Sequence, residues 1–248
     1  MEELEHSLFI VELFNKIFAK PVAFLLNLLG FHVHDTEHLI PDYIVMVLLV
    51  AISLIIFFWL SSRNLKIVPS KRQSILELII ELFESIIVDV IGEEGKKYLP
   101  VIATIGLFIL CCNLIGLAPG MMSPTSKLNV TVGCALVVFS YYHWQGIRAQ
   151  GLFKYLKHFT GPTILLAPLL IPIEIISHFS RIISLSVRLF GNIFAEELLI
   201  IIILSIVPFV LPLPFMAIAI FTAVIQAFVF VLLACIYIAG AVAHEEEH

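Results

Sequence analysis

Long apolar runs, separated by short polar connections, make up most of this chain. Residues 43–60 form a stretch of 18 positions without a charged side chain, which is enough for a helix to cross the hydrocarbon core of a bilayer. Similar runs follow at 99–118, 128–144, 164–206 and 209–242. None of them alternates strictly between apolar and polar positions, so they favour helices over the strands of a barrel. The pattern predicts an all-α, polytopic membrane protein with about five transmembrane helices.

The last two runs are too long to stand upright in a bilayer. As one helix, residues 164–206 would extend about 65 Å, roughly twice the thickness of the hydrocarbon core. Two short spans joined by a turn would also fit this length, but no Gly/Pro cluster or polar loop interrupts the run before Pro208. We therefore expect one steeply tilted helix. The run 209–242 is also too long, and the prolines near its start predict a turn, so the two runs form a long tilted C-terminal hairpin.

Two other segments are expected to lie outside the bilayer core. Between residues 74 and 92 the polar positions recur at helical spacing, which predicts an amphipathic cytoplasmic helix. Its polar face is acidic, whereas helices that lie on lipid usually carry Lys or Arg, so it faces water or a partner subunit. The apolar stretch 8–29 is broken by charges and by Pro21. We expect residues 1–42 to form an outer-side N-terminal segment and residues 43–248 to form the membrane domain.

Positive charge gathers in two of the connections. The first run is followed by Arg63, Lys66, Lys71 and Arg72, and the third by Arg148, Lys154 and Lys157. Short loops rich in Lys and Arg stay in the cytoplasm. Both connections therefore predict the same orientation, with the N-terminus outside and the C-terminus inside.

Composition agrees with a membrane protein and excludes several other classes. Of 248 residues, 60% are hydrophobic and 13% are charged, and the mean hydropathy is +1.08, well above that of a soluble domain. A net charge of −5 argues against nucleic acid as a partner. The four cysteines lie in apolar stretches and lack the Cys-x-x-Cys spacing of a metal site. The histidines at 32, 34 and 38 have no cysteine near them, so we expect no metal site there either. No phosphate-binding loop is present, so we expect the chain neither to bind nor to hydrolyse ATP, and we expect no cofactor.

Charged side chains interrupt the long run 164–206. They are Glu174, Arg181, Arg188, Glu196 and Glu197. A charge at the centre of a membrane helix costs about 2.5 to 3.5 kcal/mol, so each is a candidate for function. The first three recur every seven residues, which places them on one face of a helix, and Asn192 extends that line beyond Arg188. A polar line along a tilted apolar helix is what an ion route needs.

Local pairing inside the bundle is the alternative explanation for these charges. Glu174 would then meet Ser177 and His178, and Arg181 would reach the cytoplasmic interface. Arg188 fits this alternative less well, because no acidic residue lies three or four positions away on either side. Its counter-charge must come from elsewhere.

Residues 186–198, Ser-Val-Arg-Leu-Phe-Gly-Asn-Ile-Phe-Ala-Glu-Glu-Leu, resemble the signature helix of subunit a of F-type ATP synthases. Two earlier stretches, Asn-Leu-Ile-Gly-Leu-Ala-Pro-Gly at 113–120 and Ser-Pro-Thr with Leu-Asn-Val-Thr at 123–131, are similar to earlier spans of that family. Gln-Ala-Phe-Val-Phe at 226–230 resembles its last helix. The resemblance covers nearly the whole chain from about residue 40.

The resemblance implies a proton-translocating a subunit of the Fo sector, located in a bacterial inner membrane. In this family an arginine faces a rotating ring of c subunits, each with one carboxylate in the membrane, and two half-channels each open to one side. Arg188 would be that arginine, coupling proton flow to ring rotation and ATP synthesis. The chain would be a non-catalytic subunit, present once in a hetero-oligomeric ATP synthase, with the c ring, the b subunit stalk and lipid around it. The choice between H⁺ and Na⁺ rests mainly on the ring.

The same resemblance assigns the remaining polar residues to the two half-channels. It places Glu174 and Ser177 in the cytoplasmic half-channel, and Asn113, Asn192, Glu197 and Gln226 in or beside the outer one. For Gln226 a packing role stays open. The family often carries a second titratable residue seven positions before this glutamine, where this chain has Ala219. Glu196 stands where many relatives carry Gly or His, and we expect it to take over part of that role.

Three other classes of membrane protein fit the residues less well. A secondary transporter would show inverted repeats around a site near the midplane, and the chain has none that we can see. A haem-bearing subunit would carry paired histidines within its spans, and these are absent from the sequence. A structural anchor would not place Arg188 inside an apolar helix.

Overall fold

The computed structural model consists of helices and their connections in the part of the chain that it describes. That part comprises residues 40–63, 65–118, 121–158, 167–206 and 211–242, with positions 11, 14–16, 21 and 23 before them. Its helices are α2 (Asp42–Ser62), α3 (Lys71–Ile91), α4 (Leu99–Ile115), α5 (Leu128–Gln150), α6 (Leu152–His158), α7 (Ala167–Ile206) and α8 (Pro212–Val242), with 3₁₀ turns η2 (Glu93–Tyr98) and η3 (Pro124–Ser126). No strand occurs in these ranges, so the all-α prediction is confirmed. The histidines at 32, 34 and 38 lie outside the described residues.

Four of the described helices are long and apolar enough to cross a membrane: Asp42–Ser62, Glu93–Ile115, Pro168–Ile206 and Pro212–Val242. The fifth expected span, 128–144, forms the greater part of α5. α5 does not meet the same apolar criterion, because tyrosines, a histidine and an arginine occupy its second half. It nevertheless packs along both α7 and α8 inside the bundle.

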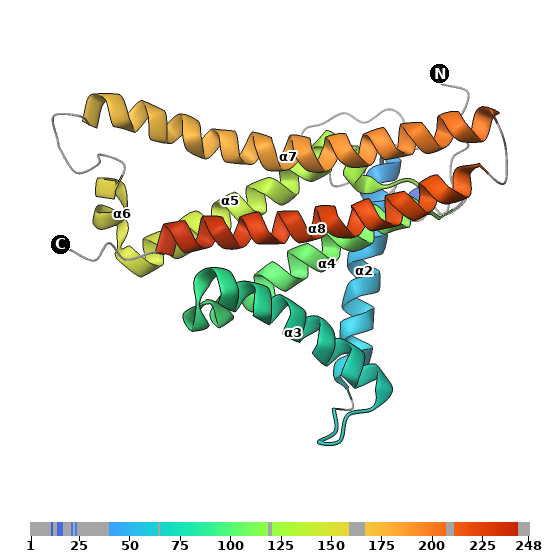
Figure 1. The fold of residues 1–248 in the computed structure, drawn as a ribbon, viewed down its shortest axis with the longest axis horizontal. Helices are drawn as coiled ribbons and strands as arrows, with labels where there is room; N and C mark the ends of the chain where they lie inside the picture. Colours follow the sequence, from blue (N-terminus) through green and yellow to red (C-terminus); the bar gives the residue numbers. More distant parts are fainter. Residues whose placement is uncertain are drawn as a thin grey trace.

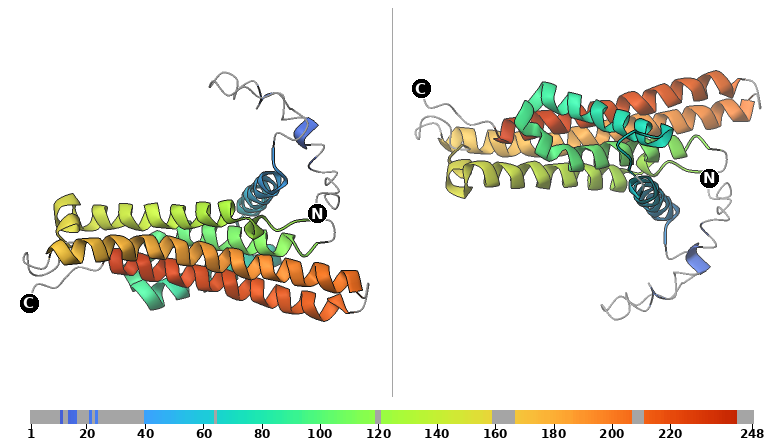
Figure 2. Two further views of the ribbon diagram at one scale, coloured as in Figure 1. Left: turned by 90° about the horizontal axis from the view of Figure 1, so that it is seen from above. Right: turned by 90° about the horizontal axis from the view of Figure 1, so that it is seen from below.

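The last two helices form the long hairpin that the sequence predicts. α7 is one continuous helix of 40 residues. This confirms the prediction of a single long helix and not the alternative of two short spans joined by a turn. α8 has 31 residues and runs back beside α7 (Figures 1 and 2). Both lie across the direction of α2 (Figure 1), so an upright α2 leaves them strongly tilted.

One face of α7 closes the core of the bundle. Leu185, Leu189 and Ile193 recur every four residues and are buried against residues of α5 and α8, as the helical period requires. On the other side of α8, α4 comes close enough to need a glycine. A Cβ on Gly106 would lie 2.6 Å from Val231 Cγ2.

The amphipathic helix expected at 74–92 is present as α3, which begins three residues earlier. The Ser70 side chain accepts a hydrogen bond from the Gln73 backbone N–H at 3.5 Å, at the start of the helix. Gly92 has a φ of 92°, and its N–H donates to Val88 O at 2.9 Å where the helix ends. Such a left-handed conformation suits glycine.

An apolar groove of about 1260 Å³ opens between α2, α4 and α5. Its walls are almost entirely aliphatic and aromatic side chains, among them Leu54, Phe58 and Val101. Gly133 of α5 also lines it, and a Cβ at this position would meet no atom within 4 Å.

Candidate ion-translocation site

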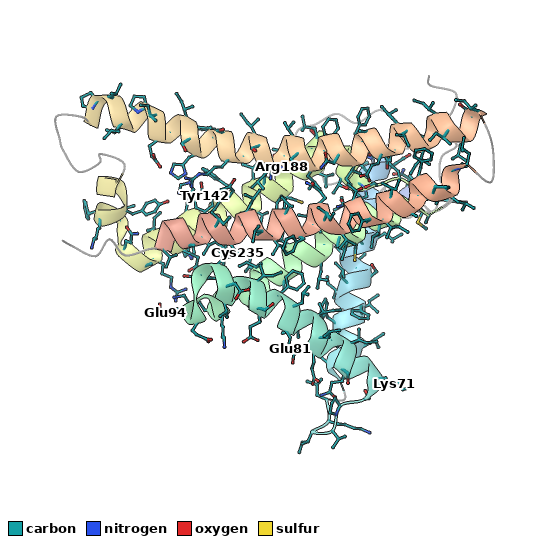
Figure 3. The ribbon with its side chains drawn as sticks, viewed as in Figure 1. Lys71, Glu81, Glu94, Tyr142, Arg188 and Cys235 are labelled. Atoms are coloured by element: carbon teal, nitrogen blue, oxygen red, sulfur yellow. The ribbon has the colours of Figure 1, made fainter. Side chains whose placement is uncertain are left out.

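Arg188 lies near the middle of α7 (Figure 3). Its side chain is exposed, whereas Leu189, the next residue, is fully buried in the core. Within the described part of the chain no hydrogen bond or ion pair reaches the guanidinium. Exposed apolar side chains lie beside it on α7, among them Val187 (52% exposed) and Phe194 (42% exposed), while Ser184 and Asn192 lie one turn away on its own face. α7 therefore carries an unpaired cation on an open, apolar side of the molecule.

One turn further along α7, an amide pair joins the two long helices. Asn192 Nδ2 donates to Gln226 Oε1 at 2.8 Å. Gln226 itself is only 3% exposed. The pair fixes the register of α7 against α8 beside Arg188, and neither amide can titrate.

Glu197 lies at one end of a chain of hydrogen bonds that crosses the bundle. Its carboxylate Oε1 accepts the Ser123 backbone N–H at 2.8 Å, and the hydroxyls of Ser123 and Thr125 are 2.8 Å apart. Thr125 Oγ1 donates to Asn113 Oδ1 at 2.7 Å. Asn113 Nδ2 reaches Ala223 O at 3.4 Å. The turn η3 thereby links a titratable group on α7 to α4 and α8.

Glu196 points toward α8 instead. Thr222 of α8 lies near its carboxyl group, and the Thr222 hydroxyl donates to Ile218 O of its own helix at 2.9 Å. Thr222 follows Ala219 by three positions, which is about one helical turn. The carboxyl group of Glu196 therefore lies near the turn of α8 that contains Ala219.

A second polar group surrounds the beginning of α7, on the opposite side of Arg188. Glu174 Oε1 lies 3.4 Å from His178 Nε2, and His178 Nδ1 lies 2.8 Å from the Tyr142 hydroxyl of α5. The guanidinium of Arg181 stacks on the Tyr237 ring of α8 at 5.2 Å. The local contact expected between Glu174 and His178 is therefore present, and Arg181 lies against an aromatic ring.

A polar cavity of about 70 Å³ opens within this second group. It is lined by Tyr142, Gln150, Tyr155, Glu174, His178, Arg181, Gly240 and Ala241. A water molecule occupies about 30 Å³ of liquid, so the cavity has room for water and has polar partners to hold it. His143 stacks at its edge and makes a hydrogen bond of 2.6 Å with the Tyr155 hydroxyl. Ser177, also expected here, is half-buried and its hydroxyl has no hydrogen bond among the described residues.

Arg188 thus separates two polar groups along one helix. Glu174 precedes it by 14 positions, about 21 Å of helix, and Glu197 follows by nine, about 14 Å. Each group contains a carboxyl group that can exchange protons, while Arg188 cannot. In the described part of the chain no cluster of three His, Cys, Asp or Glu side chains is arranged to hold a metal ion.

The structure adds four polar residues to these groups, of which sequence reasoning had named only His178, as a local partner of Glu174. Tyr142 and His178 join Glu174, and Ser123 and Thr125 join Glu197 to Asn113. Ser123 and Thr125 belong to a motif that carried the family resemblance, which was a usable signal. Tyr142 had none, because its partner lies 36 positions away on another helix.

Comparison with known proteins shows the family to which this chain is similar. The model of the ATP synthase A chain family matches residues 43–239. A Campylobacter fetus protein named ATP synthase subunit a is 48% identical over 209 residues, which cover 84% of this chain and 92% of the relative. Two further relatives have the same name. The Helicobacter hepaticus protein is 48% identical over 202 residues, which cover 81% of this chain and 89% of the relative. The Geotalea daltonii protein is 45% identical over 224 residues, which cover 90% of this chain and 94% of the relative. The resemblance seen in the sequence is confirmed, and the chain belongs to the ATP synthase A chain family.

Proposed function

We propose that this chain carries protons between the two sides of a bacterial inner membrane by presenting Arg188 to the carboxylates of a rotating c ring. The observation that carries the proposal is the unpaired, exposed guanidinium on an apolar surface. Lipid would make such a charge costly. A carboxylate on a neighbouring membrane helix supplies the missing counter-charge.

Arg188 acts by its charge and not as a proton relay, because a guanidinium keeps its proton at physiological pH. A cation favours the ionised form of a carboxylate beside it. A ring carboxylate that arrives at Arg188 therefore releases its proton to one half-channel, and it takes up another only after moving past. Ionised carboxylates are costly in hydrocarbon, so only the neutral form rotates through lipid. A membrane potential contributes about 2.3 kcal/mol per charge for each 100 mV.

The two polar groups on either side of Arg188 support two separate half-channels. Glu174 and Ser177 belong to the cytoplasmic one, and the cavity next to Glu174 gives water a place in it. Glu196 and Glu197 supply proton-exchanging groups to the outer one. Asn113, Asn192 and Gln226 hold the outer group in place through their hydrogen bonds.

The orientation follows from the positive connections. α6 and the end of α5 carry the second set of basic residues and lie near the start of α7 and the end of α8 (Figures 1 and 2). Basic loops stay inside, so the group around Glu174 opens to the cytoplasm. The N-terminus is then outside and the C-terminus inside. One copy serves a complex in which the b subunit stalk is a further partner and other subunits carry out ATP chemistry.

The exchange Arg188→Ala tests the proposal. In inverted membrane vesicles, we expect ATP-driven proton pumping to fall to background while the chain still co-purifies with the c ring. Arg63→Ala is the matched control, because this exposed arginine ends α2 and lies away from α7, and its vesicles should pump normally. Normal pumping by the Arg188→Ala complex would end the proposal.

A further inference from the structure

The strongest observation outside the expected site residues is the contact of His178 with two polar partners at once. The imidazole is buried, and it bridges Tyr142 on α5 to Glu174 on its own helix. All three side chains line the same polar cavity. A buried polar side chain in a membrane helix marks a functional position more often than a packing position.

The Glu174 carboxylate beside Nε2 favours one neutral form of the ring, in which Nε2 carries the proton. A phenol hydroxyl that donates to Nδ1 leaves the proton of the neutral imidazole on Nε2, which faces the Glu174 carboxylate. Both nitrogens are then engaged in a path that runs from hydroxyl to imidazole to carboxylate. Histidine is the side chain whose ordinary pKa is closest to neutrality, so it is suited to gain and lose protons in such a path.

We propose that His178 is a proton carrier in the cytoplasmic half-channel, with Tyr142 as its positioning residue and Glu174 as its proton acceptor. This rests on the proposed function of the chain. A hydronium ion in the cavity breaks one O–H bond and gives its proton to Nδ1, where a new N–H bond forms and water is left behind. The Tyr142 hydroxyl turns to accept this N–H. The Nε2–H bond breaks and its proton passes to Glu174, which releases it to cytoplasmic water. The ring regains its first tautomer by exchange with the same water, so protons and charge balance.

The charged groups around the His178 ring allow it both to gain and to lose a proton. The charged or titratable side chains that the structure places around it are Glu174 and Arg181 of α7, Tyr142 and His143 of α5, Tyr155 of α6 and Tyr237 of α8. The Glu174 carboxylate stabilises an imidazolium. The Arg181 guanidinium opposes it. The two charges act in opposite directions, so neither protonation state of the ring is strongly favoured.

The decisive variants are His178→Gln and His178→Glu in the complete ATP synthase. Gln keeps a polar side chain but cannot exchange a proton, whereas Glu can. We expect passive proton conductance through the membrane sector, measured in vesicles after removal of the catalytic subunits, to fall about tenfold in the Gln variant. The Glu variant should recover a large part of the loss. A purely structural role predicts the reverse order, because a second carboxyl group beside Glu174 is repelled.

A titratable side chain away from the cavity provides the control. Glu77→Gln also replaces a titratable group with an amide, but Glu77 is exposed on α3 and does not line the cavity, so conductance should stay close to that of the parent. Tyr142→Phe removes one hydroxyl and should lower conductance several-fold. If neither His178 variant assembles into the complex, the conductance of the Tyr142→Phe variant tests the proposal. Conductance at the level of the parent would then overturn it.

Failure of this inference is distinguishable from failure of the proposed function. If His178→Gln conducts like the parent while Arg188→Ala does not pump, His178 is not a carrier and the role of Arg188 stands. If Arg188→Ala pumps normally, the proposed function fails, whatever the His178 variants do.

Discussion

Arg188 and Leu189 are adjacent in the chain and have opposite environments. Leu189 is fully buried, while Arg188 lies exposed on the apolar side of α7. A helix turns by about 100° per residue, so successive side chains point in different directions. A seven-residue spacing of polar positions therefore keeps Arg188 out of the core without breaking the helix. Under the proposed function, a carboxylate of the c ring supplies the counter-charge for Arg188.

Glu196 is the residue for which the structure adds most to the family pattern. Its carboxyl group lies beside Thr222, one turn from Ala219. We expect Glu196→Gln to slow ATP-driven proton pumping several-fold, because the outer half-channel loses a group that exchanges protons. Pumping in inverted vesicles at matched ATPase activity measures this.

Glu77→Gln is the control for that exchange. Glu77 is exposed on α3 and bonds only to its helix neighbour Gln73 among the described residues, so the same loss of charge should leave pumping unchanged. Equal rates in the Glu196→Gln variant and the parent would show that Glu197 alone serves the outer half-channel.

Charged residues inside an apolar run could be predicted as site residues from the sequence, because a charge in a membrane helix is energetically costly. Residues whose role depends on contacts between helices could not. Arg188 and Glu174 are charges in an apolar run, so their positions alone made them candidates. Tyr142 and His178 are ordinary amphipathic side chains. Their significance depends on α5 and α7 lying side by side at one particular register, which no local pattern encodes.

At the scale of helices, length was the informative quantity. Forty residues without an interrupting turn predicted α7 as one helix, and the structure confirms it. The predicted span 128–144 ends before α5 does, at Gln150, because polar side chains in the second half of the helix weaken the apolar signal. Two of these side chains, Tyr142 and Gln150, line the polar cavity beside Glu174. The sequence signal is therefore weakest where the helix contributes most to the site.

Gly106 permits the close approach of α4 to its neighbours, and an alanine there tests the packing. A Cβ at this position would lie 2.6 Å from Val231 Cγ2 and 2.7 Å from Phe83 Cε1. Overpacking of this kind costs about 1 to 3 kcal/mol, more than the roughly 0.5 to 1 kcal/mol that alanine gains over glycine in a helix. We expect Gly106→Ala to lower the temperature at which the detergent-solubilised complex releases this chain.

Gly133→Ala provides a comparison of opposite sign. It makes the same change in the neighbouring helix α5, where an added Cβ meets no atom within 4 Å, so only the gain in helix propensity remains. The release temperature should stay level or rise. A loss of the same size in both variants would contradict the packing described for α4.

Across the whole molecule, each of the two polar groups lies next to a different connection between helices. The group around Glu174 lies at the end of the bundle that holds the basic residues of α5 and α6 (Figure 1). The group around Glu197 is held by η3, just before Lys127. A route with one opening on each side of the membrane therefore needs these two connections to lie on opposite sides.

Cysteine labelling tests this division directly. Lys127 and Lys154 are both exposed, the first between η3 and α5 and the second in α6. The positive-inside rule places Lys154 in the cytoplasm, and α5, which lies between the two lysines, then places Lys127 outside. We expect a membrane-impermeant maleimide to label Lys127→Cys in intact cells and Lys154→Cys only in inverted vesicles. The parent chain sets the background, because its four cysteines lie within helices α4, α5 and α8 and at least half-buried. Labelling of both variants from the same side would contradict a route with one opening on each side of the membrane. A chain with both polar groups on one side could not drive a ring by moving protons across the membrane.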